Sequence, residues 1–412
     1  MMRRIISALS LSLLLVVSVY GQSVEASYSE WLQSAKRGDP HAKAMVAYHL
    51  KNGIGVEKSL DDATRWALSA ATQSGLANWL LAQMHVGRKG KMEYLEAALS
   101  NNYPLVAPLY ARLYLNGSDY FGIKSSKRNQ DMAIDYFQKA ANSGFAEDAA
   151  YLGYHFLNEA KDNAKAFHYF NMAAKSGDVE SMAMVANMLF FGVGTSRNDR
   201  AAFEWYKKAA EGGSQSGIEG LADCYRLGVG VLPDQDEAFR NYMKITSPTP
   251  RVQYILGYYY ANKTNPSEED LSKAKSLLWY SEIFGDLYSR AFRGISLFEG
   301  AAPFEKDIEQ AHTYLELVYA DKDFNTLPAA LRQKVYKYLS GYYRYGIDVD
   351  ENLSLAEQLF EKAEELQSEV DRSQGPYAFA GPRSAEEALG SYSLKLSPAS
   401  EVLKQVVLTT NV

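Results

Sequence analysis

The sequence contains a motif that recurs at a nearly constant spacing over most of its length. Its clearest copy is residues 201–210, Ala-Ala-Phe-Glu-Trp-Tyr-Lys-Lys-Ala-Ala, and it is followed by Gly212 and Gly213. Aligned positions from Tyr169 to Tyr314 are separated by 36, 36, 36 and 37 residues. Weaker copies occupy residues 63–71, 133–141 and 166–174. Such a period is typical of a solenoid, in which each unit packs only on its neighbours.

A second pattern precedes each copy and predicts another helix. Its clearest form is residues 256–260, Leu-Gly-Tyr-Tyr-Tyr, in which large, small and large residues at i, i+1 and i+4 share one helical face. A Gly-x-Gly turn separates the two helices at residues 53–55, 192–194 and 228–230. Glycine accepts a positive φ and therefore ends the first helix. Acidic or amide residues such as Asp199 and Asp234 then begin the second helix.

The combined pattern resembles a known family of helical repeats. It reads Leu-Gly-x-x-Tyr-x-x-Gly-x-Gly-Val, an Asp-rich turn, then Ala-x-x-Trp-Tyr-x-x-Ala-Ala-x-x-Gly, and it resembles the Sel-one-like repeats, which are related to tetratricopeptides. The resemblance covers about residues 28–366 in roughly nine copies, although the copies after Pro248 lose the Trp-Tyr or the Ala-Ala pair. It implies an all-α, right-handed α/α superhelical solenoid of about nine helix pairs, with Trp205 in its core.

The N-terminal residues 1–26 have the features of a secretory signal peptide. Arg3 and Arg4 precede an apolar run at residues 5–19, and small residues offer cleavage sites after Gly21 or Ala26. The alternative is an uncleaved anchor, but the run is shorter than the roughly 20 residues that a membrane span needs. No cysteine follows the run to carry a lipid. We therefore expect a periplasmic or secreted protein whose solenoid occupies residues 27–366.

The repeat pattern stops after Leu366, so residues 367–412 are predicted to be a linker and an amphipathic tail. Proline and glycine interrupt residues 367–400, whereas apolar residues at 402, 403, 406 and 407 share one helical face. Because so short a helix is not stable alone in water, residues 400–408 should dock on the protein. One candidate site is the last repeat helix near Leu359 and Phe360. The other is the protein's own concave groove, where the tail would compete with a partner.

Composition and spacing argue against several kinds of chemistry. The formal net charge is −6, and no basic surface suited to nucleic acid is visible. The histidines lack metal-ligand spacing, and the Gly-x-Gly turns lack the rest of a nucleotide-binding loop. Cys224 is the only cysteine, beside Asp223, which does not favour a reactive thiolate. We therefore expect no catalytic residue, metal or cofactor.

Function is predicted mainly from the resemblance, because such repeats usually act as adaptors. It implies an exported, non-catalytic scaffold that binds a protein or peptide partner in its concave groove, in a bacterial cell-envelope process. The alternative is an envelope hydrolase or enzyme regulator built on helical repeats, which would need polar residues converging in one cleft.

In tetratricopeptides, two positions on the first helix of each repeat line the concave face, and both can be identified in this chain. One is the residue directly after the small residue of the first-helix pattern, and the other lies four residues before it. The alternative is an inner face that is merely solvated. The offsets predict partner binding by Tyr154, Asn187, Asp223, Tyr254 and Tyr258.

Overall fold

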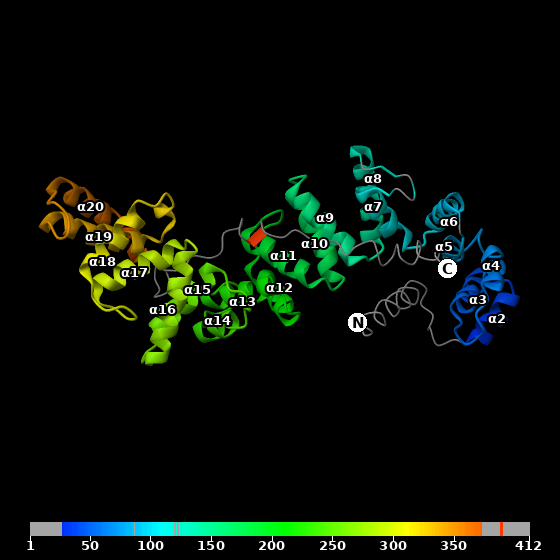
Figure 1. The fold of residues 1–412 in the computed structure, drawn as a ribbon, viewed down its shortest axis with the longest axis horizontal. Helices are drawn as coiled ribbons and strands as arrows, with labels where there is room; N and C mark the ends of the chain where they lie inside the picture. Colours follow the sequence, from blue (N-terminus) through cyan, green and yellow to red (C-terminus); the bar gives the residue numbers. More distant parts are fainter. Residues whose placement is uncertain are drawn as a thin grey trace. The chain divides into compact units, whose positions relative to one another are not determined.

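The computed structural model describes residues 27–85, 87–118, 121, 123–124, 126–372 and 388–389 (Figure 1). In these residues the regular structure is helical, apart from one isolated antiparallel bridge between Ser118 and Ile123. The chain divides into two compact units, and the division falls between His155 and Phe156. The predicted signal peptide and the predicted tail helix at residues 400–408 lie outside the described residues.

The described part of the first unit begins with a helix that carries a tryptophan. This helix, α2, presents a buried Trp31 and packs against α3. The helices of this unit are α2 (Tyr28–Lys36), α3 (Pro40–Asn52), α4 (Leu60–Leu68), α5 (Gly75–Met84), α6 (Arg88–Ser100), α7 (Val106–Asn116), α8 (Lys127–Asn142) and most of α9 (Ala146–Asn158).

The second unit continues the same alternation of first and second helices of each repeat. Its helices are α10 (Asn163–Lys175), α11 (Val179–Phe191), α12 (Asp199–Glu211), α13 (Gln215–Leu227), α14 (Gln235–Tyr242), α15 (Pro250–Ala261), α16 (Glu268–Ile283), α17 (Leu287–Glu299), α18 (Ile308–Tyr319), the 3-10 turn η1 (Phe324–Thr326), α19 (Ala329–Tyr345), α20 (Leu353–Glu365) and α21 (Gln367–Arg372). Residues 367–372, which the sequence places in a linker, are therefore helical.

Helix contacts follow the order of the chain within each unit. Most helices pack against the next one, and first helices also contact the next first helix, as α3 does with α5 and α11 with α13. This arrangement confirms the predicted all-α solenoid of helix pairs. No helix among the described residues combines the length and the apolar character needed to cross a bilayer.

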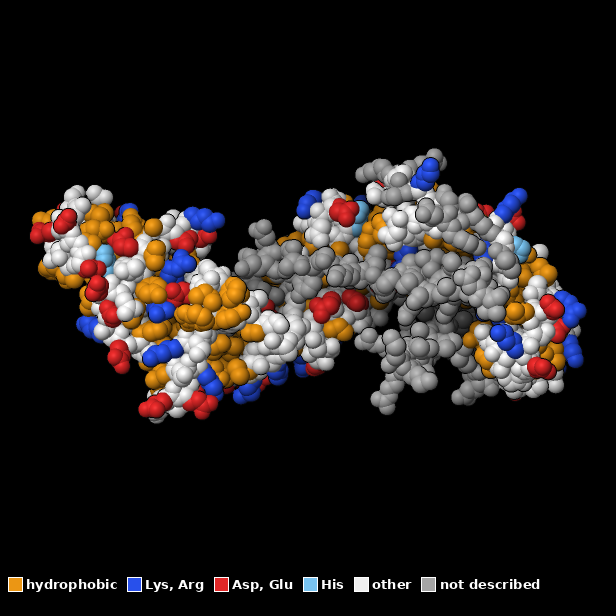
Figure 2. All heavy atoms as spheres, viewed as in Figure 1, with side chains coloured by type: hydrophobic (Ala, Val, Ile, Leu, Met, Phe, Trp, Pro, Cys, Tyr) orange, Lys and Arg blue, Asp and Glu red, His pale blue; other side chains and the backbone are white. Residues whose placement is uncertain are grey.

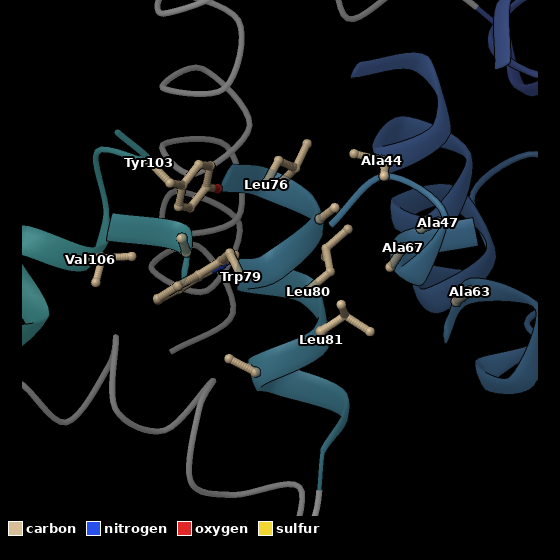
Figure 3. Packing of buried hydrophobic residues seen from close by; sticks show 14 of the residues in the cluster. Ala44, Ala47, Ala63, Ala67, Leu76, Trp79, Leu80, Leu81, Tyr103 and Val106 are labelled. Atoms are coloured by element: carbon tan, nitrogen blue, oxygen red, sulfur yellow. The ribbon is translucent and has the colours of Figure 1, made fainter. Parts of the chain in front are cut away.

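Small residues allow the helices of a pair to approach closely. In the first unit Ala47 on α3 and Ala63 and Ala67 on α4 are fully buried (Figure 3). Larger rings fill the space further along, where the centroids of Trp79 and Tyr103 lie 5.6 Å apart. These buried alanines therefore serve close helix packing.

The two glycines of each Gly-x-Gly turn have different roles. The first, such as Gly192 or Gly228, ends its helix in the left-handed conformation. The second also has a positive φ, and it lies against the start of the preceding second helix. A Cβ on Gly194 would lie 2.0 Å from the Asn163 carbonyl oxygen, and one on Gly230 would lie 2.2 Å from the Asp199 oxygen. The second glycine is therefore needed for helix packing as well as for the turn.

The prediction that Trp205 lies in the core is wrong. Trp205 is only partly buried, and the ammonium of Lys208 lies 4.7 Å from the centre of its ring. The next residue, Tyr206, is buried instead. The same displacement by one position occurs in other copies, where Phe137 and Phe170 are fully buried. In each of these second helices, small residues lie four positions before and three positions after the buried ring. They share one helical face with the ring, and this face packs inward.

Substitution of Trp205 by alanine should therefore have a modest effect. We expect a loss of about 1–2 kcal/mol, from a partly buried ring and one exposed cation–π contact. Thermal and urea unfolding of the full chain would measure it. The control is Trp279→Ala, at a ring position on α16 that is 56% exposed, and it should cost less. A loss of 3 kcal/mol or more for Trp205→Ala would restore the prediction of a core tryptophan.

Candidate partner-binding surface

The five predicted partner-binding residues do not form one exposed stripe. Tyr154 lies on α9 within the first unit, whereas Asn187, Asp223, Tyr254 and Tyr258 lie on α11, α13 and α15 of the second unit. Four of the five are buried, and Tyr258 is partly exposed. Several of them have polar partners within the protein.

Asn187 is held in one orientation by the second helix of its own repeat. The hydroxyl of Tyr206 donates to Oδ1 of Asn187 at 2.6 Å. The amide nitrogen Nδ2 of Asn187 donates to the main-chain carbonyl of Ala388 at 2.8 Å. Since Tyr206 fixes the acceptor side of the amide, the donor side is directed at the carbonyl.

Asp223 belongs to a buried ionic cluster, which we define as Glu219, Asp223, Arg226 and Arg251. Oδ1 of Asp223 lies 3.0 Å from Nη2 of Arg226 and 2.6 Å from Nη2 of Arg251. Glu219 accepts from Nη1 of Arg251 at 2.9 Å. The cluster contains two positive and two negative groups, so it is formally neutral. Asp223 is therefore committed to contacts that hold α13 to the start of α15.

A tyrosine of the second helix completes both sites in the same way. The Tyr242 hydroxyl donates to Oδ1 of Asp223 at 2.5 Å, as the Tyr206 hydroxyl does to Asn187. Burial raises the pKa of the Tyr242 hydroxyl, and the Asp223 carboxylate raises it further. The sequence carries a signal for this bond, because both the tyrosines and their partners are one 36-residue period apart. The bond shows that these positions have a structural role within the repeat.

The first unit uses a different buried pair at the equivalent position. Arg112 on α7 contacts Asp148 on α9 at 2.5 Å, and both side chains are buried. Burial raises the pKa of Asp148 from 3.8 to about 6, although the Arg112 guanidinium opposes part of this shift. Because the folded state binds this proton more tightly than the unfolded state, protonation of Asp148 favours folding.

The raised pKa of Asp148 should be visible in the pH dependence of the free energy of unfolding. Its contribution to stability increases as the pH falls through about 6 towards 3.8, and is smallest above 6. We expect this group to add about 1 kcal/mol between pH 7 and pH 5. Urea unfolding of wild type and Asp148→Asn at both pH values isolates this difference from the other carboxyls. Parallel pH profiles of the two proteins would contradict the prediction.

A pocket of about 440 Å³ lies within the second unit, between α13, α14 and α15. Tyr254 and Tyr258 line it together with aromatic rings from α14 and polar groups that follow α15. Its lining residues are Arg226, Gln235, Asp236, Ala238, Phe239, Tyr242, Tyr254, Ile255, Tyr258, Tyr259, Asn262, Lys263 and Thr264. The structure therefore brings two of the predicted residues together with others that sequence reasoning missed.

Tyr254 lines this pocket, and its hydroxyl is buried. Among the described residues that hydroxyl has no hydrogen-bond partner. Burial raises its pKa well above the ordinary value, and the neighbouring Tyr258 adds to the shift. The hydroxyl therefore stays neutral and can both donate and accept a hydrogen bond. Tyr259 has a partner, because its ring stacks on Phe239 at 3.8 Å and its hydroxyl donates to Asp236 at 2.9 Å.

A separate apolar patch lies at the C-terminal end of α16, the helix that follows α15 in the sequence. It consists of Trp279, Tyr280, Ile283 and Phe284, all substantially exposed. Hydrophobic side chains are visible over this part of the second unit in Figure 2, around α15 and α16. The rings of Tyr280 and Phe284 lie 4.6 Å apart. Exposed apolar surface of this kind often marks a contact site.

The part of the chain that the structure describes contains no group of three or more histidine, cysteine or acidic side chains placed to hold a metal ion. Cys224 is a fully buried thiol on α13 and is not part of a disulfide. His49 and His312 are buried in repeat helices, and Nδ1 of His49 hydrogen-bonds to the Ile54 carbonyl at 2.8 Å.

Comparison with solved structures finds similar folds. One is c5321, a protective antigen of uropathogenic Escherichia coli with an SLR fold, at 20% identity and a TM-score of 0.55, covering 92% of this chain and 89% of that one. Another is a Sel1 repeat protein of Oxalobacter formigenes, at 20% identity and a TM-score of 0.42, covering 76% and 91%. No curated protein matches the sequence.

Comparison with known protein families identifies the repeat itself. The Sel1 repeat matches six segments, residues 40–75, 109–145, 146–178, 179–214, 217–244 and 337–368. These segments contain the helix pairs described above, including α11 with α12 and α13 with α14. The c5321 structure has the same type of fold. This chain therefore belongs to the Sel1 repeat family.

Proposed function

We propose that this protein is an exported, non-catalytic scaffold that binds a protein or peptide partner through its second unit. Sel1 repeats typically mediate protein–protein interaction, which supports a scaffold. The observation that carries the proposal is the pocket at Tyr254 and Tyr258. Its volume of about 440 Å³ lies within the range of ligand sites, roughly 300–1,000 Å³.

The lining of the pocket favours a large apolar or aromatic side chain of a partner. Phe239, Tyr254 and Tyr258 offer ring surfaces, which give contact area with little loss of side-chain entropy. The Asn262 amide could pair with a polar group at the end of such a side chain.

Binding can be tested by selecting peptides from a library on the full-length protein and measuring the affinity of the selected peptides. The selected peptides should share a large apolar or aromatic residue. Tyr258→Glu, at the partly exposed rim of the pocket, should weaken binding at least tenfold. The matched control is Tyr345→Glu, at a tyrosine that is 72% exposed on α19, and it should have no effect.

The same assay distinguishes the pocket from the α16 patch. Tyr280→Glu places a charge on that patch, where Tyr280 is 44% exposed. If Tyr280→Glu abolishes binding while Tyr258→Glu leaves it intact, the proposed pocket is wrong and the α16 patch is the contact surface. Turnover of an envelope polymer by the isolated protein would contradict the non-catalytic part of the proposal.

The proposed location outside the cytoplasm rests on the N-terminal sequence. Arg3, Arg4 and the apolar run at residues 5–19 support export, and an envelope role follows from it. We expect the mature protein to begin at Gln22 or Ser27. Expression with the native N-terminus, followed by N-terminal sequencing of each cell fraction, tests this. Recovery in the membrane with Met1 still present would refute cleavage.

A further inference from the structure

Two residues from near the C-terminus lie against α11 in the middle of the repeat array. Ala388 and Leu389 are helical and belong to the second unit, although they are 201 and 202 positions after Asn187 (Figure 1). Ala388 is 0% exposed and Leu389 is 8% exposed. These two residues are therefore packed into protein and are not simply lying on its surface.

The contact with α11 is a specific hydrogen bond. Nδ2 of Asn187 donates to the Ala388 carbonyl at 2.8 Å, and Asn187 is 0% exposed. Because Tyr206 holds the other side of the amide at 2.6 Å, the donor is oriented in advance. A buried, oriented amide recognises the main chain of whatever segment lies against it, and the neighbouring side chains then select among segments.

The equivalent position in the next repeat could not make this bond. Asp223 replaces Asn187 there, and an ionised carboxylate has no proton to donate to a carbonyl. Asp223 is also committed to Arg226 and Arg251. Between these two repeats, recognition of a main-chain carbonyl is therefore a property of the Asn187 site alone.

We infer that the segment containing Ala388 and Leu389 is an intramolecular ligand of the Asn187 site, so that a partner peptide reaches this site only when the segment leaves. The competitive role rests on the proposed function, whereas the docking itself does not. A ligand in the same chain acts at an effective concentration that is typically in the millimolar range. It lowers the apparent affinity of a competing peptide by the fraction of molecules in which the site is free.

The competing partner should resemble the segment that it displaces. It would present a main-chain carbonyl to Asn187, with a small residue at that position and a leucine-like residue after it. Residues 383–394, Arg-Ser-Ala-Glu-Glu-Ala-Leu-Gly-Ser-Tyr-Ser-Leu, supply a probe with this chemistry.

Limited trypsin digestion of the full chain tests docking without any partner. Arg383 lies five residues before Ala388, and cleavage there reports how often the segment is released. Leu389→Asp puts a charge at a buried position, and Asn187→Asp keeps the acceptor for Tyr206 but removes the donor. Each should raise the cleavage rate about tenfold or more. The matched control is Leu232→Asp, at a leucine that is 84% exposed, and it should leave the rate unchanged. Equal cleavage of wild type and both variants would overturn the inference.

A labelled synthetic peptide of residues 383–394 tests occupancy of the site in the full-length proteins. By fluorescence anisotropy it should bind Leu389→Asp at least tenfold more tightly than wild type, whose site is occupied. The double variant Asn187→Asp with Leu389→Asp should not bind it. Equal binding to wild type and Leu389→Asp, or binding that survives in the double variant, would refute the assignment.

The peptides selected on the full-length protein separate this inference from the proposed function. If they bind Leu389→Asp more tightly than wild type, the segment competes with partners. If they bind both proteins equally, the competitive role is wrong. Failure to select any peptide that depends on Tyr258 counts against the proposed function alone, since digestion and the labelled peptide test docking independently.

Discussion

Replacing Asp223 with alanine is expected to lower the free energy of unfolding of the second unit by about 3–5 kcal/mol. The substitution removes one acid from the buried ionic cluster, so that only Glu219 remains to pair with two arginines. Arg226 has a side chain that is 4% exposed, and it would lose its carboxylate partner at 3.0 Å. Tyr242 would lose its acceptor as well. Uncompensated buried charge and unsatisfied polar groups are among the costliest consequences of a single substitution.

The measurement should resolve individual repeats, because a repeat array can unfold in parts. Urea unfolding gives the overall effect, and amide hydrogen exchange shows whether α13, α14 and α15 lose protection first. The control is Asp131→Ala, at an exposed position of α8, which should change stability by no more than about 0.5 kcal/mol. A change below 1 kcal/mol for Asp223→Ala would show that the cluster contributes little net stability.

Replacing Gly230 with alanine should have an effect of similar size for a different reason. Gly230 has a φ of +71°, and its Cβ would lie 2.2 Å from the Asp199 carbonyl oxygen and 2.8 Å from that carbonyl carbon. A left-handed conformation costs alanine about 1–2 kcal/mol, and forced overpacking adds about 1–3 kcal/mol. We therefore expect a loss of roughly 2–5 kcal/mol, because the carbonyl belongs to the backbone of α12 and cannot simply rotate away.

Gly213 provides a matched control for this prediction. It also has a positive φ, of +88°, but a Cβ there would meet nothing within 4 Å. Gly213→Ala should therefore lose only the conformational part, about 1–2 kcal/mol. Thermal unfolding of both variants separates backbone strain from close packing. If the two alanines are equally destabilising, the contact between the Gly-x-Gly turn and the preceding helix is not important.

Local rules predict much of this fold because the same interactions are repeated many times. Gly192 and Gly228 end their helices where the sequence predicts, since a left-handed residue at a helix end is a local requirement. The starts of the second helices also agree with the sequence, since α12 begins at Asp199 and Asp234 is the N-cap of α14. The capping side chain of α12 is that of the preceding residue, Asn198, which accepts from the Ala201 amide.

The candidate site was predicted less well than the fold. Tyr254 and Tyr258 do line a pocket, but Phe239, Tyr259 and Asn262 come from other positions of the repeat and were not predicted. Offsets carried over from tetratricopeptides identify a face of the first helix. They do not show whether that face is open, or whether Tyr206 and Tyr242 on the second helix cover it with hydrogen bonds.

The sequence by itself determined the period, the alternation of helices and the glycines that separate them, because these depend on contacts between residues close in the chain. Tertiary structure alone decided which of two adjacent rings, Trp205 or Tyr206, is buried, since both lie near the inward face and the neighbouring helix selects between them. It also brought Ala388 to Asn187, 201 positions away. No periodicity encodes such a contact, because it depends on how a distant segment fits the finished surface.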